Sequence, residues 1–568
     1  MNKIVVCLIA LIAGAAALAP AAAQEAAAGL AGGPVIIAPA QSELGQIIKT
    51  GLSSAYYGAA KDSTAYGEAQ KLYFFYGGRH FEPIWVEQSP SGTVSFSASA
   101  QKIMALFESA ASEGLRPSDY LTPDLNLAGV TPSANAMATL ETAFSRATLR
   151  YASHIYNGRI KPQSVSDQLD ITPKKLDTAA LLIELATSPD PVAVLARLEP
   201  VHPEFQALKR ALASFDETSA AERPPQVQAG PTLKPGMYDA RVHTLRARFN
   251  LGAAQSDLYD DQLVGAMKAF QRQHGLDVDG VMGPATLTTL NGGAPVTRAD
   301  IIANMERWRW MPRDLGAFHV LVNIPEYRLA ISNNGVEQFT TRVVVGTVKN
   351  QTPVFSDNIR HLVVNPYWNV PNSIVKGEIG PKTRANPGYV DAQNMDLLYN
   401  GEVVSPWQVN WQAVGDGFPF RVRQRPGPGN ALGQIKFLFP NKHDVYLHDT
   451  PSKGLFGRSA RALSHGCVRV EDPMAFADAL MANEPNISRS SLEAMYGPSE
   501  RWVNPTKQIP VHLAYFTLRV GADGTLQSYG DIYGHNANLI AALGLGQPGA
   551  VSPQITASAD PASNELAP

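Results

Sequence analysis

The chain has 568 residues, of which 45% are hydrophobic and 17% charged, and its formal net charge is −3. This length and apolar content predict several globular domains with sizeable cores. The charge lacks the basic excess typical of nucleic-acid-binding proteins, so we expect no nucleic-acid partner.

The first 23 residues have the pattern of a removable signal peptide. Lys3 gives a short positive region, residues 4–18 are mainly apolar, and three alanines at 21–23 form a cleavage site. The apolar stretch is shorter than a comfortable bilayer span, so an uncleaved anchor is the less favoured alternative. We therefore expect an exported, periplasmic protein whose residues 24–64 form a flexible linker.

Two helical regions follow. Ile103, Leu106, Phe107 and Ala110 fall on one face of a helix, and residues 65–222 are predicted to form a helical scaffold domain. Residues 232–292 carry three short helical patterns, and Pro284 opens the third of them at a permitted first-turn position. We predict a small three-helix module there.

The pattern changes to a period of two within residues 300–484. Val320, Val322 and Ile324 alternate, and Asn334 and Gly335 supply a hairpin turn before the alternation resumes. This predicts a mainly antiparallel β domain. Residues 372–430 interrupt it with a stretch rich in Gly, Pro and Asn, which is typical of an inserted lid.

The remaining residues carry no motif of their own. We expect residues 485–545 to be a C-terminal portion that packs on the catalytic or scaffold region. Residues 546–568 have almost no large apolar side chains, so we predict a disordered tail. The predicted fold class is therefore multidomain α+β, with a helical scaffold, a three-helix module and a mainly antiparallel β domain carrying a lid.

Cys467 is the residue most informative about chemistry. The other cysteine, Cys7, lies in the predicted signal peptide, so the mature chain carries a single thiol. Exported proteins usually pair their cysteines or avoid them. A lone thiol is therefore a candidate nucleophile or a partner in an intermolecular disulfide, and the neighbouring histidines favour the nucleophile.

Two histidines are candidates to assist this thiol. Strand alternation places His448 on the same face as Tyr446, and His448 can meet the sulfur if Cys467 begins an adjacent strand. We therefore expect His448 to act as the base. Either the Asp449 side chain or a backbone carbonyl could orient it.

The residues around the thiol are assigned by position. We expect His465 to orient the loop and Gly466 to leave backbone N–H groups near the thiol free to face an oxyanion. Arg469 lies two residues beyond Cys467, on the same side of the strand, and could hold a substrate carboxylate.

The motif Ser464-His465-Gly466-Cys467 with Arg469 resembles the L,D-transpeptidase catalytic domain family, also called YkuD. In that family a histidine precedes the motif by a gap of about sixteen residues, and His448 and His465 enclose 16 residues here. The run from Gln271 to Thr286 resembles the peptidoglycan-binding domain family. The order of the regions and the segment 365–371 are similar to the large YcbB-type members of Gram-negative bacteria.

The resemblance implies cell-wall cross-linking by a cysteine acyl-enzyme. Cys467 would attack a tetrapeptide donor stem after its third residue, D-alanine would leave, and an amine of a second stem would complete a three-to-three cross-link. His448, His465 and Gly466 would share the catalytic work with Cys467. Substrate-binding roles would fall to Tyr446, Ser464, Arg469 and Trp368, the last at the root of the lid.

The resemblance also implies partners and leaves alternatives. Partners would be peptidoglycan stem peptides and glycan, other cell-wall synthesis proteins, and carbapenem inhibitors. No metal or organic cofactor is implied. A hydrolase that trims stems or releases wall-attached protein, a non-catalytic wall-binding protein, and a zinc site formed by Cys467, His465 and His448 remain open alternatives.

Overall fold

A computed structural model describes residues 36–546, apart from positions 129–130, 216–226, 229, 254–255, 274–275, 291–295, 415–417, 485 and 522. The chain divides into two compact units. One comprises Met1–Arg159 with Lys174–Glu199, and the other comprises Ile160–Pro173 with Pro200–Pro568. The predicted signal peptide and the predicted tail from residue 547 lie outside the described residues.

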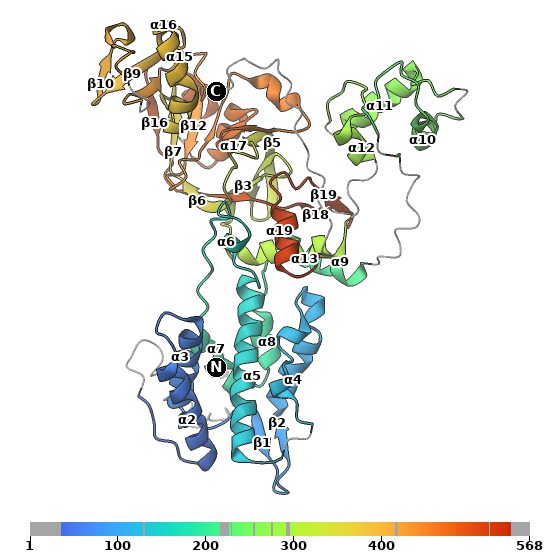
Figure 1. The fold of residues 1–568 in the computed structure, drawn as a ribbon, viewed down its shortest axis with the longest axis vertical. Coiled ribbons are helices and arrows are strands. Elements are labelled where there is room, and N and C mark those ends of the chain that lie inside the picture. The colour runs from blue at the N-terminus through green and yellow to red at the C-terminus, as the bar shows by residue number, and fades with distance from the viewer. Residues whose placement is uncertain are drawn as a thin grey trace, which may run out of the picture. The chain divides into compact units, whose positions relative to one another are not determined.

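The first unit is mainly helical. Its helices are α2 (Glu43–Gly58), α3 (Thr64–Gly77), α4 (Ala98–Glu108), α5 (Ala134–Asn157), α7 (Thr178–Thr187) and α8 (Pro191–Ala196), with a short hairpin of β1 (Val86–Gln88) and β2 (Val94–Phe96). Helices α2 and α3 lie side by side (Figure 1). Ile103 and Phe107 of α4 are buried in its core with Ala110, which lies just after the helix, and Leu106 packs against this core partly buried.

Helix α2 corrects one sequence expectation. The sequence predicts a flexible linker over residues 24–64, yet residues 43–58 form a helix whose N-terminus is capped by the Ser42 side chain. Ile48 and Leu52 lie on one face and are buried in the core of the first unit. Their spacing of four residues is helical, and this apolar face explains why the segment folds.

The second unit is built on an eleven-stranded mixed sheet. Its strand order is β16-β7-β12-β13-β15-β5-β4-β3-β17-β6, and β14 pairs with β5. The first seven strands in the chain are β3 (Phe318–Asn323), β4 (Arg328–Asn333), β5 (Val336–Gly346), β6 (Phe355–Ile359), β7 (His361–Val364), β12 (Ile435–Leu438) and β13 (Leu447–His448). The last four are β14 (Ala462–Ser464), β15 (Val468–Val470), β16 (Arg501–Val503) and β17 (Ile509–Ala514).

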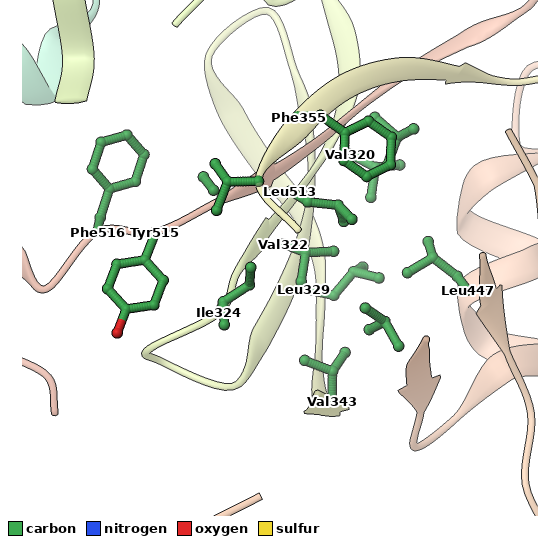
Figure 2. Packing of buried hydrophobic residues seen from close by; sticks show 14 of the residues in the cluster. Val320, Val322, Ile324, Leu329, Val343, Phe355, Leu447, Leu513, Tyr515 and Phe516 are labelled. Carbon is green, nitrogen blue, oxygen red and sulfur yellow. The ribbon is translucent and has the colours of Figure 1, made fainter. Parts of the chain in front are cut away.

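Side-chain alternation fixes the core of this sheet. Val320, Val322 and Leu329 are fully buried, and Figure 2 shows them grouped with Val343 and Leu513 from neighbouring strands. Leu447 of β13 also points into this core (Figure 2). Because neighbouring residues of a strand face opposite sides, Tyr446 and His448 lie on the side away from Leu447.

The sheet is less antiparallel than the sequence predicts. Strand β13 runs parallel to β15, β17 runs parallel to β3, and β14 runs parallel to β5. Alternation reveals which face of a strand is buried but not the direction of its neighbour. The predicted turn at Asn334 and Gly335 is present, with both residues at positive φ, as a tight hairpin requires.

Several helices accompany the sheet: α6 (Pro162–Val165), α9 (Pro203–Ser214), α13 (Arg298–Trp310), α17 (Pro473–Leu480), α18 (Arg489–Glu493) and α19 (His535–Ala542). Thr297 and Asp300 form a capping box at the start of α13. Residues 301–310 of this helix are all buried, and α13 contacts α19 (Figure 1). The C-terminal portion therefore belongs to the core, and it also contains the hairpin of β18 (Leu518–Val520) and β19 (Leu526–Ser528).

The insertion is an ordered subdomain, here called the capping subdomain (residues 368–432). It has a four-stranded sheet of β8 (Trp368–Asn369), β9 (Met395–Tyr399), β10 (Glu402–Val404) and β11 (Arg421–Gln424). Its helical segments are α14 (Asn372–Ile374), α15 (Gly380–Ala385), α16 (Gly388–Ala392), a π-helical turn at Val375–Ile379 and a 3-10 turn at Pro406–Gln408. It has its own apolar core.

Residues 227–290 form a separate small core. Helices α10 (Arg241–Arg248), α11 (Asp261–Gln273) and α12 (Pro284–Leu290) lie in this segment. Val242, Leu245, Leu263 and Met267 are buried, as their helical spacing predicts. The Gln271 side chain bonds both the Gly280 N–H and the Val281 carbonyl, which fixes the turn between α11 and α12.

Candidate active site

Cys467 lies directly before β15, beside the start of the parallel strand β13. Its side chain is partly exposed, and its Sγ lies 3.8 Å from the Asp444 carbonyl oxygen. Burial of the sulfur raises the pKa of the thiol to about 11, although hydrogen bonds from the Tyr446 backbone and side chain and the charge of Arg469 oppose this rise. The resting thiol is therefore protonated and still accessible from one side.

Tyr446 is half-buried between two apolar cores. It packs against the core of the sheet and also against that of the capping subdomain. Its hydroxyl bonds the Cys467 side chain, and burial raises the pKa of Tyr446 well above its ordinary range. Its ring meets the His448 ring edge-on at 5.7 Å. The structure thus places Tyr446 against the thiol itself, which sequence reasoning did not specify.

His448 is buried and is held by a backbone carbonyl. Its Nδ1 lies 2.5 Å from the carbonyl oxygen of Asp449. A carbonyl can only accept, so Nδ1 carries the proton and Nε2 is left as the basic nitrogen. Of the two orienting groups left open by the sequence, the structure favours the backbone carbonyl, because the Asp449 side chain bonds Gln434 N–H, Thr450 N–H and Lys453 instead.

The electrostatic surroundings keep this imidazole neutral. Burial lowers the pKa of His448 to about 3, with further lowering by the charge of Arg469. Register pairs His448 with Arg469 on β15 and with Lys436 on β12, so cations flank it on both neighbouring strands. The imidazole is therefore neutral at pH 7, and its Nε2 is the nitrogen left free to accept a proton.

Arg469 lies deeper than predicted. It is only 1% exposed, and burial lowers the pKa of its guanidinium to about 10. Its charge acts on both the Cys467 thiol and the His448 imidazole. The structure therefore supports an electrostatic influence on this pair, whereas the predicted contact with a substrate carboxylate stays a prediction.

The loop before Cys467 is held by its own hydrogen bonds. The Ser464 hydroxyl donates to the Cys467 carbonyl at 2.6 Å and accepts from the Gly466 N–H at 3.1 Å. Ser464 is 2% exposed. Both of its partners lie inside the loop, so the structure supports a loop-organising role, and the predicted contact with substrate stays a prediction.

Gly466 has a conformation that explains its residue type. Its φ is +118°, which an L side chain rarely adopts. The sequence predicts free backbone N–H groups near the thiol, yet the N–H of Gly466 is bonded to Ser464. Within the described residues, the Cys467 N–H keeps no protein acceptor. The candidate oxyanion donor is therefore the amide of Cys467 and not that of Gly466.

His465 faces the capping subdomain. Its Nε2 lies 3.2 Å from Oε1 of Glu378, and both side chains are more than a third exposed. Glu378 belongs to the π-helical turn at Val375–Ile379. Sequence reasoning missed Glu378, since nothing in the motif indicates a carboxylate almost a hundred positions earlier. The π-helical turn, a geometry frequent near functional sites, is visible only in the structure.

Trp368 belongs to the core of the capping subdomain. It is 7% exposed and pairs with Gln424 across β8 and β11. Its described surroundings are the apolar residues of that core. Its predicted place on a substrate groove therefore stays a prediction.

The three candidate zinc ligands have other partners. Nε2 of His465 bonds Glu378 and Nδ1 of His448 bonds a backbone carbonyl, so these two nitrogens are already engaged. Among the described residues, no group of three or more His, Cys, Asp or Glu side chains could hold a metal ion. None of the helices described is long and apolar enough to cross a membrane.

Three family profiles match the chain. The profile described as "L,D-transpeptidase catalytic domain" (YkuD) matches residues 317–487. One described as "Putative peptidoglycan binding domain" matches residues 245–290, and one described as "Scaffold domain" matches residues 70–212. The first match contains every candidate site residue named above.

Known proteins give a similar result. A protein of Haemophilus influenzae named "Putative L,D-transpeptidase" is 37% identical over 240 residues, which are 42% of this chain and 48% of that protein. The chain therefore aligns with about half the length of this curated relative.

Among solved structures, an L,D-transpeptidase from Xylanimonas cellulosilytica is 16% identical, with a TM-score of 0.16, over 50% of this chain and 98% of that chain. A fused Zn-dependent amidase/peptidase/peptidoglycan-binding domain-containing protein from Clostridium acetobutylicum is 11% identical, with a TM-score of 0.14, over 50% of this chain and 100% of that chain. Scores this low carry no argument.

The chain thus contains a YkuD L,D-transpeptidase catalytic domain and a peptidoglycan-binding domain, which confirms the resemblance to these two domain families.

Proposed function

We propose that this protein is a periplasmic L,D-transpeptidase that forms three-to-three cross-links in peptidoglycan through an acyl-enzyme on Cys467. One observation carries the proposal. A partly exposed thiol bonded by Tyr446 lies directly before β15, and the neighbouring strand β13 carries a buried, neutral His448 whose Nδ1 is fixed by the Asp449 carbonyl. This arrangement provides a nucleophile, a base and a group that orients the base.

The first half-reaction forms the acyl-enzyme. Nε2 of His448 takes the thiol proton as Sγ attacks the carbonyl of the third stem residue, and the Cys467 N–H faces the resulting oxyanion. Collapse breaks the amide bond, and the proton on His448 passes to the amine of the departing D-alanine. The products are a thioester on Cys467 and free D-alanine.

The second half-reaction restores the enzyme. The side-chain amine of an acceptor stem attacks the thioester carbonyl, and His448 accepts a proton from that amine. Cys467 leaves as the thiol after receiving this proton. One amide bond has been broken and one formed, so the exchange needs no external energy source and no redox partner.

The resting charges determine how the proton moves. A thiol pKa of about 11 beside an imidazole pKa of about 3 means that a preformed thiolate–imidazolium pair is unfavourable. Proton transfer must therefore accompany the attack on the substrate. Arg469 stabilises the negative sulfur as charge develops, because its cation acts directly on Cys467.

Water competes with the amine for the same thioester. The capping subdomain approaches the nucleophile loop through the Glu378–His465 contact and packs on Tyr446. We propose that it acts as a lid that excludes water during the lifetime of the acyl-enzyme. A stem-trimming hydrolase would use the same residues without this protection.

The other parts of the chain fit the same activity. The peptidoglycan-binding domain would hold glycan near the catalytic domain, and the N-terminal signal would direct export. A carbapenem would acylate Cys467, since the thiol can open a strained lactam by the same first half-reaction.

Mass spectrometry of the full-length protein with purified tetrapeptide stems tests the proposal. We expect an acyl adduct on Cys467, release of D-alanine and dimeric stems. Hydrolysed stem without dimer would identify the hydrolase instead. No adduct from stems or from a carbapenem on folded protein would overturn the acyl-enzyme itself.

A further inference from the structure

Tyr533, in the C-terminal portion, is connected to the nucleophile loop by a closed set of hydrogen bonds. Its hydroxyl donates to the Gly346 carbonyl at 2.6 Å and accepts from the Thr352 N–H at 3.2 Å. The Thr352 hydroxyl accepts from the Gly346 N–H at 2.9 Å and donates to the Gly466 carbonyl at 2.7 Å. Four bonds thus join three segments of the chain.

These contacts are shielded from water. Thr352 is fully buried and Tyr533 is 8% exposed. Burial raises the pKa of Tyr533 to about 12, so its hydroxyl stays protonated and remains a donor. A side chain at Gly346 would bring a Cβ within 2.0 Å of the Asn350 carbonyl oxygen, so the turn that presents Thr352 requires glycine there.

The Gly466 carbonyl belongs to the peptide unit that ends in the Cys467 N–H. A trans peptide is planar, and its C=O and N–H point in opposite directions. A hydrogen bond that holds the carbonyl toward Thr352 therefore points the N–H of Cys467 away from Thr352. Polarisation of the carbonyl also makes that N–H a stronger donor.

We propose that Thr352, held in place by Tyr533, is a positioning residue that aims the backbone N–H of Cys467 at the oxyanion of the acyl-transfer reaction. The inference rests on the proposed function, because only acyl transfer generates that oxyanion. It assigns a role to the C-terminal portion, which carries no motif of its own. Neither residue touches substrate, so both act through the loop.

Two reactions of the same sulfur separate positioning from general damage. Acylation by a tetrapeptide stem passes through an oxyanion, whereas alkylation by iodoacetamide displaces iodide and forms none. Thr352→Val removes the hydroxyl and keeps the shape. We expect it to lower acylation of the full-length protein about 10- to 100-fold, since an oxyanion donor is worth about 100- to 1,000-fold and here is misaimed, not removed.

Other readouts should stay near wild type. Alkylation should change less than about twofold, and KM for the stem should change little. Thr352→Ser should restore most of the acylation rate that Thr352→Val loses. The matched control is Thr347→Val, which removes a hydroxyl from the same turn that bonds only the Asn350 N–H. We expect it to acylate like the wild type.

Wild-type acylation by Thr352→Val, or a parallel loss of alkylation, would overturn the positioning role. If that variant does not fold, the ratio of acylation to alkylation is measured in Tyr533→Phe, which removes both hydroxyl bonds and keeps the ring. If the wild type itself does not react with stems, the proposed function fails. Acetylation by p-nitrophenyl acetate, which also forms an oxyanion, then tests the positioning role alone.

Discussion

Two clusters of titratable groups in this chain differ in how many hydrogen-bond partners they have. In the first unit, the Glu141 carboxylate accepts from the N–H groups of Ile84, Trp85 and Val86 at 2.8–3.0 Å and from the Tyr76 hydroxyl at 2.5 Å. In the second unit, Cys467 and His448 each have few partners, and the sulfur is partly exposed.

The comparison separates structural burial from chemical readiness. Burial shifts the pKa in both clusters, upward for Glu141 and Cys467 and downward for His448. Four donors leave Glu141 no free capacity for a substrate, so it stabilises the fold. His448 instead keeps one nitrogen available, and the exposed side of Cys467 leads to solvent. A shifted pKa alone therefore does not identify an active site.

Replacing Cys467 by Ala should have the largest effect on activity and almost none on stability. Turnover of stems should fall at least about a thousandfold, because the covalent step is lost. The melting temperature should change little, since the side chain is small and partly exposed. D-alanine release and thermal melting measure the two effects. Substantial turnover by this variant or by Cys467→Ser would contradict the nucleophile assignment.

His448→Ala tests whether the second cluster works as a pair. We expect stem turnover to fall about 100- to 10,000-fold, as for loss of a general base. Rates of iodoacetamide alkylation against pH provide the second readout, and in the wild type they should rise toward pH 11 as the thiolate forms. An unchanged turnover rate in this variant would show that another group takes the proton.

Glu141→Ala should have the opposite outcome to Cys467→Ala, because it should lower stability and leave turnover unchanged. Three backbone N–H groups would lose their acceptor in the interior, so we expect the first unit to lose about 3 kcal/mol or more of unfolding free energy. Turnover per folded molecule should stay the same. Urea unfolding measures the loss, and Glu184→Ala, which breaks an exposed ion pair, is the matched control. A loss below about 1 kcal/mol would contradict the structural role.

Acid should affect the units differently. Burial lowers the pKa of His448 to about 3 and those of His512 and His535 to about 4, from 6.5. The unfolded second unit thus binds protons first as pH falls below about 6.5, and each histidine costs about 1.4 kcal/mol of stability per pH unit until its folded pKa is reached.

For Glu141 the sign is opposite, because its folded pKa is raised. Its contribution is present at low pH and is lost as pH rises through that folded pKa. Pulse proteolysis in urea at pH 7 and pH 5, with fragments assigned to each unit, compares the two. His535→Asn should reduce the pH dependence of the unfolding free energy of the second unit by the contribution of about one proton. Greater acid loss in the first unit would refute this expectation.

Glu378→Gln should have the smallest effect. Its contact with His465 is exposed, and exposed ion pairs contribute about 0–1 kcal/mol. We expect turnover within a few-fold of wild type and a rise of about two- to fivefold in hydrolysed over cross-linked stems, since the lid is held less firmly. The control is Glu402→Gln, on β10 of the same subdomain. Identical product ratios in both variants would argue against a role of the Glu378–His465 contact in holding the lid.

The local motifs were more informative than the long-range contacts. The helix face at Ile103 and Phe107, the hairpin at Asn334 and the juxtaposition of Tyr446 with His448 follow from periodicity and turn chemistry. The sequence could not reveal that β13 and β15 are parallel, that Glu378 meets His465, or that Thr352 holds the Gly466 carbonyl. Each depends on chain segments brought together only by the whole sheet. The helix α2 was missed because an Ala- and Gly-rich stretch precedes it.

Strand β17 imposes an order on folding. It lies between β3 and β6, pairing Val511 with Val320 on one side and with Asp357 on the other. During synthesis, β3 and β6 must therefore wait with open edges until almost the whole chain has emerged, and contacts this distant in sequence form slowly. The sheet therefore cannot be completed until β17 has been synthesised. A chain truncated before Ile509 would expose two unpaired strand edges, which are sites of aggregation.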